Sequence, residues 1–229
     1  MVKNAPNCLW LEKKPFQNDL RKALGKEVFC ENDANCFALS EAIDGSGKHY
    51  KIVYGIILGS GVGGGLVIDK KIVSGPNGVA GEWGHNQIPY FAAKKENFDS
   101  NNAREAEIES FISGLGMAKR FNKIYKKNLK TNEIFELNRK HDLDAERFID
   151  EFKINLAMSL ATIINILDPD AFVFGGGVSN EIDFLSEKPI SRFKQTGKKR
   201  KKIEKSTENA NLPRIPIKTQ GFLLKPGDS

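Results

Sequence analysis

The succession of apolar and polar positions predicts strands that alternate with helices. Residues 50–61 (YKIVYGIILGSG) form an almost unbroken apolar run that ends in glycines, as expected of a buried strand followed by a tight turn. Residues 64–73 are expected to pair back on it as a hairpin, with a turn at Asp69-Lys70-Lys71. Short apolar runs at 27–30 (EVFC) and 171–174 (AFVF) predict two further strands.

Helical periodicity marks three segments. Residues 33–45 (DANCFALSEAIDG) predict a helix that ends at Gly45. Apolar residues recur at three- and four-residue spacing from Ala106, and again from about Ala145 to Leu167, where Asp144 is the expected cap. Because strands and helices alternate along the chain, the fold class is predicted to be α/β.

A long loop is predicted at residues 74–89 (SGPNGVAGEWGHNQIP), where glycine and proline are too frequent for regular structure. Long loops in compact domains often carry function. Glu82 and His85 lie three residues apart in this loop, so their side chains can converge on one ligand. His85 is equally compatible with an ordinary structural histidine.

Composition limits the functional classes. The chain has 229 residues, 40% hydrophobic and 28% charged, without an apolar run long enough to span a membrane. The three cysteines, Cys8, Cys30 and Cys36, show no paired spacing, and no secretory leader is recognised, so a cytoplasmic location is expected. The net charge is +6, but residues 188–205 hold nine Lys or Arg and one Glu. Elsewhere acidic residues outnumber basic ones, so neither nucleic acid nor membrane is expected as a partner.

The glycine-rich stretch 59–65 (GSGVGGG) contains a GxGxxG pattern. A dinucleotide-binding fingerprint requires a helix after the glycines, whereas a strand is predicted here, so that interpretation is rejected. Backbone N–H groups at such a hairpin tip can converge on a phosphate, with the Ser60 hydroxyl beside them. The alternative is a tight turn. Residues 174–177 (FGGG) form a second glycine loop, suited to a nucleobase or ribose, or only to a turn.

Two further acidic residues have both a structural and a chemical interpretation. Asp33, within Asn32-Asp33-Ala34-Asn35, stands where a strand is expected to end and a helix to begin. It is therefore suited to cap the helix or to perform chemistry at its start. Glu109, near the start of the next predicted helix, is either a solvated helix residue or a ligand.

Four segments taken in order resemble the signature segments of ROK-family sugar kinases. They are NDANCFALSEA (32–42), ILGSGVGGGLVIDKKIVSGPNGVAGEWGHNQIP (57–89), IESFISG (108–114) and NILDPDAFVFGGGVSN (165–180). The form of the GEWGHN loop is most similar to bacterial fructokinases of the mannose/fructose kinase type, and the resemblance covers about residues 2–187. It implies an actin-like ATPase (ribonuclease H-like) fold. Residues 1–33 would be a remnant of the N-terminal lobe, 34–187 the larger lobe and 188–229 a basic segment that diverges from the family.

The resemblance also implies a reaction, the transfer of the γ-phosphate of ATP, with Mg²⁺, to a hexose hydroxyl. Fructose, converted to fructose 6-phosphate, is the expected substrate, with N-acetylglucosamine or glucose as alternatives. Asp33 matches the catalytic base, which takes a proton from the attacking hydroxyl. The positions that match sugar ligands are Asn32, Gly81, Glu82, His85 and Glu109. The positions that match the nucleotide-binding loops are Gly59, Ser60, Gly61, Gly63, Gly175, Gly176 and Gly177.

The chain departs from the family at its zinc motif. Family members follow the GH loop with a CxCGxxGC segment, whose thiolates join the loop histidine around zinc. Those three positions fall here at Ser100, Asn102 and Glu107. Because zinc favours thiolate and imidazole ligands, we predict that this chain has no structural zinc and that His85 lacks that anchor.

Two other family segments are missing from these 229 residues. No DxGGTK-type phosphate loop precedes Asn32, and FLLKPGDS (222–229) resembles only the approach to the final GDxSGxRGAA helix. Half of the phosphate clamp is therefore expected to be lacking, and a catalytically incompetent sugar-binding fragment is the alternative to an active kinase. A ROK-type repressor is not expected, because no helix-turn-helix segment precedes the sugar lobe. The resemblance leaves a homodimer open.

Overall fold

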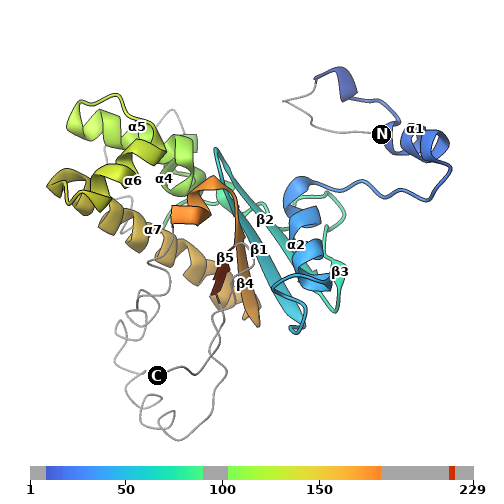
Figure 1. The fold of residues 1–229 in the computed structure, drawn as a ribbon. Coiled ribbons are helices and arrows are strands. Elements are labelled where there is room, and N and C mark those ends of the chain that lie inside the picture. The colour runs from blue at the N-terminus through green and yellow to red at the C-terminus, as the bar shows by residue number, and fades with distance from the viewer. Residues whose placement is uncertain (1–8, 90–102, 182–216, 220–229) are drawn as a thin grey trace, which may run out of the picture. The chain divides into compact units, whose positions relative to one another are not determined.

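The computed structural model describes residues 9–89, 103–181 and 217–219. The chain divides into two compact units, Met1–Asp33 and Ala34–Ser229. The helices in Figure 1 are α1 (Phe16–Leu24), α2 (Asp33–Ile43), α4 (Ile108–Ile112), α5 (Gly114–Tyr125), α6 (Thr131–Arg139) and α7 (Leu143–Leu167), with 3-10 turns η1 (Leu9–Leu11), η2 (Trp83–His85), η3 (Ala103–Ala106) and η4 (Gly177–Glu181). The strands are β1 (Ile52–Leu58), β2 (Val62–Ile68), β3 (Lys71–Ile72), β4 (Ala171–Gly175) and β5 (Ile217–Thr219).

The described strands form one mixed sheet in the order β3-β2-β1-β4-β5. β1 and β2 are an antiparallel hairpin, as predicted, and β2 turns into β3 at Asp69 and Lys70, which both adopt positive φ. β4 lies parallel to β1 on its other side, so a crossover that contains α4 to α7 joins the two. The predicted α/β class is confirmed.

The two faces of the sheet pack against different helices. On β1, Tyr54, Ile56 and Leu58 are buried in a cluster with residues of α4 to α7. Val53, between them in sequence, is buried in a smaller cluster with Ala38 of α2. Alternate residues of a strand point to opposite faces, so β1 is buried on both sides. Figure 1 accordingly shows α2 on one side of the sheet and α7 on the other.

Glycines in the sheet allow α2 to approach closely. A Cβ atom added at Gly55 would lie 2.7 Å from Cβ of Ala38, and one at Gly65 would lie 2.6 Å from the backbone oxygen of Ala34. Ala34, Ala38 and Ala42 are buried at four-residue spacing along α2. Small residues on both surfaces therefore bring the helix backbone against the strands.

The helix predicted from Ala106 is two helices in the structure. Ser113 has an extended backbone (φ −78°, ψ 159°), ends α4, and starts α5 by accepting a hydrogen bond from the N–H of Gly116 at 2.9 Å. The serine side chain satisfies an N–H group that a continuous helix would bond differently, which is a preferred use of serine at an N-cap. Apolar spacing alone did not reveal this break.

The cap of the long helix α7 was predicted two residues too late. Asp142 is the N-cap, and its Oδ1 accepts from the N–H of Ala145 at 3.0 Å, whereas Asp144 lies inside the first helical turn. The position of Asp144 near the helix N-terminus remains favourable for its negative charge.

The strand predicted at residues 27–30 is absent, because these residues have no ladder partner in the described part of the chain. The Phe29 side chain is 80% exposed, and the N–H of Cys30 donates to Oε1 of Gln17. The Met1–Asp33 unit instead contains α1, which ends at Gly25 in the left-handed conformation.

Three elements were not predicted: α1, α6 and β5. β5 pairs in parallel with β4, although residues 188–229 were expected to diverge from the family. The proposed boundaries at residues 33 and 187 stay predictions.

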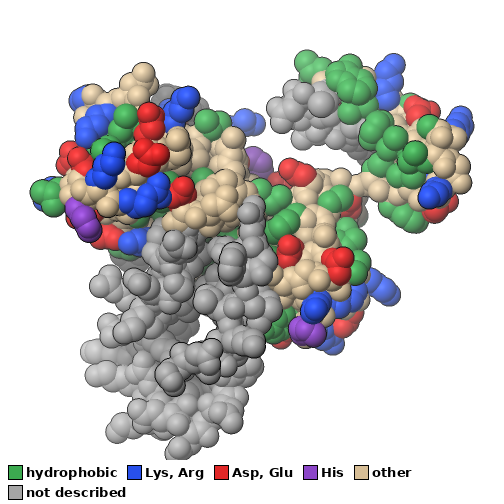
Figure 2. Space-filling view, viewed as in Figure 1, with side chains coloured by type: hydrophobic (Ala, Val, Ile, Leu, Met, Phe, Trp, Pro, Cys, Tyr) green, Lys and Arg blue, Asp and Glu red, His purple; other side chains and the backbone are tan. Residues whose placement is uncertain are grey.

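Charges of both signs cover the outer helices. Figure 2 shows Lys and Arg side chains interspersed with Asp and Glu over α5 and α6 on the face in view. Such mixed charge is typical of a solvated helix surface. No described helix combines the length and apolar character needed to cross a bilayer.

Candidate functional site

The tip of the β1–β2 hairpin is bonded to α4. Oε2 of Glu109 accepts a hydrogen bond from the backbone N–H of Val62 at 2.8 Å. A Cβ atom at Gly61 would lie 2.7 Å from the same oxygen, so a larger residue there would displace the carboxylate. The N–H of Gly114 donates to the backbone oxygen of Gly59 at 2.7 Å, which fixes the start of α5 to the same tip.

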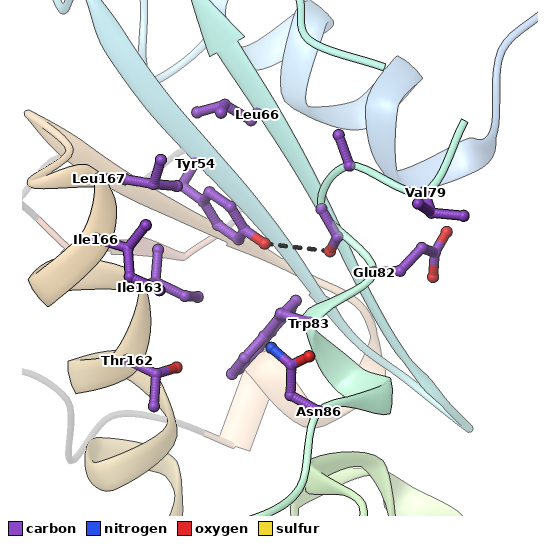
Figure 3. Close-up of a pocket in the computed structure, with 12 residues that line it drawn as sticks. Tyr54, Leu66, Val79, Glu82, Trp83, Asn86, Thr162, Ile163, Ile166 and Leu167 are labelled. Carbon is purple, nitrogen blue, oxygen red and sulfur yellow. Dashed lines mark hydrogen bonds between the residues drawn. The ribbon is translucent and has the colours of Figure 1, made fainter. Parts of the chain in front are cut away.

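The loop that carries Glu82 is fastened to the sheet at two points. The Tyr54 hydroxyl donates to the backbone oxygen of Gly81 at 3.1 Å (Figure 3), and Nε1 of Trp83 donates to the backbone oxygen of Gly63 at 3.3 Å. Gly81 has φ +94°, and a Cβ there would lie 2.5 Å from the backbone oxygen of Gly64. Only glycine satisfies both the dihedral angle and the close contact.

His85 is paired with Glu107. Nδ1 of the imidazole lies 3.0 Å from Oε2 of Glu107. The main chains on either side are also joined, because the N–H of Ile108 donates to the oxygen of Asn86, and the N–H of Ile88 to that of Ala106, each at 2.8 Å. The loop and the start of α4 therefore form a short two-stranded connection.

Three carboxylates act on the imidazole. The hydrogen bond to Glu107 raises the pKa of His85 above its usual value, partial burial opposes this, and the charges of Glu107, Glu109 and Glu82 add to the increase. Burial also raises the pKa of Tyr54, with a further contribution from the charge of Glu82. Glu82, His85 and Glu109, predicted as ligands from separate segments, thus lie in one electrostatic neighbourhood.

Asn32 and Asp33, the predicted sugar ligand and catalytic base, lie at the start of α2. Asp33 is exposed and is the first residue of α2. Asn32 is half-buried, and its N–H donates to Oε1 of Glu31 at 3.1 Å. Asn32 and Asp33 belong to the Met1–Asp33 unit, whereas Glu82, His85 and Glu109 belong to the other. The catalytic role of Asp33 stays a prediction.

Packing accounts for part of the glycine excess that favoured a phosphate site. A Cβ at Gly63 would lie 3.1 Å from that of Ala34, and one at Gly175 would lie 2.8 Å from the Phe37 ring. Gly176 has φ +90°, and its Cβ would lie 2.4 Å from a backbone oxygen of β1. Of the predicted phosphate and nucleotide glycines, Gly59 and Gly177 have open space beside them. Ser60 is exposed at the hairpin tip.

A cavity of about 310 Å³, not predicted from the sequence, lies between the loop and the end of α7 (Figure 3). Tyr54 and Leu66, register partners on β1 and β2, line it together with Trp83 and Ile163. Because they are register partners, both side chains lie on one face of the sheet, and the folded chain leaves a space there.

The residues at the expected zinc motif do not fit a structural zinc. Ser100 and Asn102 lie outside the described residues and are poor zinc ligands by chemistry. Glu107 engages Nδ1 of His85 directly. Within the described ranges, no group of three or more His, Cys, Asp or Glu is placed to hold a metal ion. The absence of zinc stays a prediction for metal analysis.

Comparison with known proteins identifies similar chains. The model of the ROK family matches residues 1–211. An N-acetyl-D-glucosamine kinase from Histophilus somni is 41% identical over 182 residues, which are 77% of this chain and 59% of the relative. This chain therefore spans about 59% of the length of that relative.

Solved structures give the fold. A ROK hexokinase from Thermus thermophilus aligns with a TM-score of 0.69 and 23% identity over 90% of this chain and 65% of its own. A ROK family glucokinase from Streptomyces griseus, solved with glucose and AMPPNP, aligns with a TM-score of 0.62 and 25% identity. The alignment covers 91% of this chain and 67% of the glucokinase chain. The predicted actin-like ATPase fold is confirmed. The fructokinase subtype is not confirmed, since the relatives from Histophilus somni and Salmonella paratyphi B, 41% and 40% identical, are N-acetyl-D-glucosamine kinases.

Proposed function

Because this chain belongs to the ROK family, we propose that it binds a hexose as part of an ATP-dependent sugar kinase. The observation that carries this proposal is the gathering of Glu82, His85 and Glu109 around one end of the β1–β2 hairpin. Carboxylates and an imidazole can accept hydrogen bonds from several sugar hydroxyls at once. Such a grip holds one hydroxyl in the orientation needed for attack on phosphorus.

Asp33 is the proposed catalytic base. An unactivated sugar hydroxyl is a weak nucleophile, and a carboxylate within hydrogen-bond reach takes its proton as the new O–P bond forms. Asn32 binds a neighbouring hydroxyl and Gly81 provides backbone contact. The exposure of Asp33 is consistent with access by substrate.

The two glycine loops are the proposed contacts to the nucleotide. Gly59, Ser60 and Gly61 present the hairpin tip to the phosphates, and Gly175–Gly177 borders the nucleoside. The AMPPNP complex of the Streptomyces griseus glucokinase supports ATP as the donor. Magnesium neutralises charge on the phosphates in such reactions. In the described ranges, no three or more Asp, Glu, His or Cys residues are grouped so that they could bind a metal ion. We therefore assign no step of this chain to it.

N-acetyl-D-glucosamine is the proposed hexose. The support is the 39–41% identity to N-acetyl-D-glucosamine kinases from several bacteria. Fructose is the second candidate, supported by the GEWGHN form of the loop that carries Glu82 and His85. Sugar binding without phosphoryl transfer is the alternative for this chain by itself.

Calorimetry and a coupled ADP assay test the proposal. The full chain is titrated with N-acetyl-D-glucosamine, fructose, glucose and mannose, and ADP formation is followed with each. We expect N-acetyl-D-glucosamine to bind most tightly. Asp33→Asn should keep binding and lose any sugar-dependent ADP formation. A folded wild-type chain that binds none of the four sugars would contradict the proposal.

Metal content and assembly are measured on the same sample. Elemental analysis should find no zinc in stoichiometric amount, and one tightly bound zinc per chain would overturn that prediction. Light scattering decides whether the chain is a homodimer.

A further inference from the structure

We propose that Glu107 is a positioning residue, which orients the His85 imidazole toward a hexose hydroxyl. This inference rests on the proposed hexose-binding function. The Glu107 side chain is 16% exposed, whereas that of His85 is 58% exposed. A largely buried carboxylate thus contacts an exposed imidazole. The ring remains accessible to a ligand while one of its nitrogens is hydrogen-bonded.

The hydrogen bond selects which nitrogen faces the ligand. Nδ1 of His85 lies 3.0 Å from Oε2 of Glu107. A carboxylate only accepts hydrogen bonds, so the proton of the neutral imidazole resides on Nδ1. Nε2 then carries the lone pair and can accept a hydrogen bond from a sugar hydroxyl. Without Glu107, the ring would be free to rotate and to exchange tautomers.

The backbone makes Glu107 a fixed support. Its neighbour Ile108 is bonded to Asn86, and Ala106 is bonded to Ile88, so the main chain at Glu107 lies against the main chain that follows His85. Glu109 is two residues further along, and its carboxylate holds Val62 at the hairpin tip. The main-chain contact between residues 86–88 and 106–108 therefore helps to position both His85 and Glu109.

The charges around His85 agree with this role. The acidic groups that face the imidazole are Glu107, Glu109 and Glu82, and all of them favour its protonated form. In that form Glu107 still accepts from Nδ1–H, and Nε2–H donates to a hexose oxygen instead of accepting from a hydroxyl. The residue at 107 stands where the family resemblance places a thiolate ligand of zinc. Glu107 contacts the histidine directly, and we assign to this contact the fastening of the loop.

Imidazole NMR tests the contact directly. The chain has three histidines, His49, His85 and His141, so the His85 signals are assigned by their loss in His85→Gln. In wild-type chain we expect the Nδ1–H tautomer and a raised pKa. Glu107→Ala should lower both the pKa and the Nδ1–H share. Glu105→Ala is the matched control, because Glu105 pairs with Lys119 and is not among the acidic groups that raise the pKa of His85.

Calorimetry tests the consequence. Glu107→Ala should raise the Kd of the hexose that binds wild-type chain by about tenfold, the size expected for loss of one charge-assisted contact. Glu105→Ala should leave this Kd unchanged. Glu107→Gln serves as a second variant that keeps the side-chain shape if the alanine variant does not fold. Like the alanine variant, it should lower the pKa of His85 and weaken hexose binding.

The outcomes separate the two proposals. If no hexose binds wild-type chain, the proposed function fails and the positioning role fails with it. If wild-type chain binds but the folded Glu107 variants bind equally well, or if the tautomer and pKa of His85 do not change, the inference about Glu107 alone is overturned.

Discussion

Glu109 bonds the hairpin tip to α4, because its Oε2 accepts from the backbone N–H of Val62 at 2.8 Å across 47 positions in the sequence. Val62 is buried, so this N–H group depends on the carboxylate for a partner of good geometry. Glu109, which we propose as a sugar ligand, therefore has a structural task at the hairpin tip.

The two tasks of Glu109 are separable by mutation. Glu109→Gln keeps an oxygen acceptor for Val62, so its free energy of unfolding should stay within about 0.5 kcal/mol of wild type. Glu109→Ala leaves the N–H group without that acceptor and should lose about 1–3 kcal/mol. Urea denaturation measures both, and equal stability of the two variants would contradict the structural task. Both variants should weaken hexose binding.

Close packing of α2 on the sheet predicts that Gly65→Ala is destabilising. The added Cβ would meet the Ala34 oxygen at 2.6 Å, so the helix or strand must shift, at about 1–3 kcal/mol. Gly59→Ala is the matched control on the same hairpin, because no atom lies within 4 Å of its added Cβ. Thermal or urea unfolding compares them, and a larger loss at Gly59 would refute the packing account.

The start of α7 offers a second matched pair. Asp142→Ala removes the side chain that accepts from Ala145 and should lower the free energy of unfolding by about 0.5–2 kcal/mol. Asp144→Ala removes only a charge near the helix N-terminus and should lose less, about 0.3–1 kcal/mol. If Asp144→Ala proves the more destabilising, the cap assigned to Asp142 is incorrect.

The His85–Glu107 pair predicts a sign for the pH dependence of stability. The folded pKa of His85 is raised above its ordinary value, so the pair stabilises the folded state fully below pH of about 6.5. That contribution is lost as pH rises through the folded pKa. The difference in unfolding free energy between wild type and His85→Gln should therefore be largest below pH of about 6.5 and shrink as pH rises through the raised folded pKa. A difference that grows with pH would reverse the prediction.

Several elements were predictable because their signals are local. The apolar run of residues 50–61 predicts β1, and the glycine-bounded hairpin and the stripe of α7 follow from periodicity. The prediction of a strand at residues 27–30 was wrong, since a four-residue segment with three apolar side chains does not specify a partner strand. β5 was missed because it is three residues long and is defined by its pairing with β4.

The candidate site divides in the same way. Glu82, His85 and Glu109 were identified from the sequence through spacing and family resemblance, and the structure gathers them in the Ala34–Ser229 unit. Glu107 was singled out only as a lost zinc position, since its contact with His85 is made across 22 positions. Excess glycine was taken as a phosphate signal, although part of it allows α2 to pack closely.

The sequence by itself determined the α/β order and the ROK resemblance, and it supplied the residues that we propose as hexose ligands. These follow from short-range periodicity and from motifs that are contiguous along the chain. Only the tertiary structure decided that Glu107 holds His85, that Glu109 holds Val62, and which glycines serve packing. Such contacts depend on how β1, β2 and α4 meet in space, and no local preference of one segment specifies the position of another.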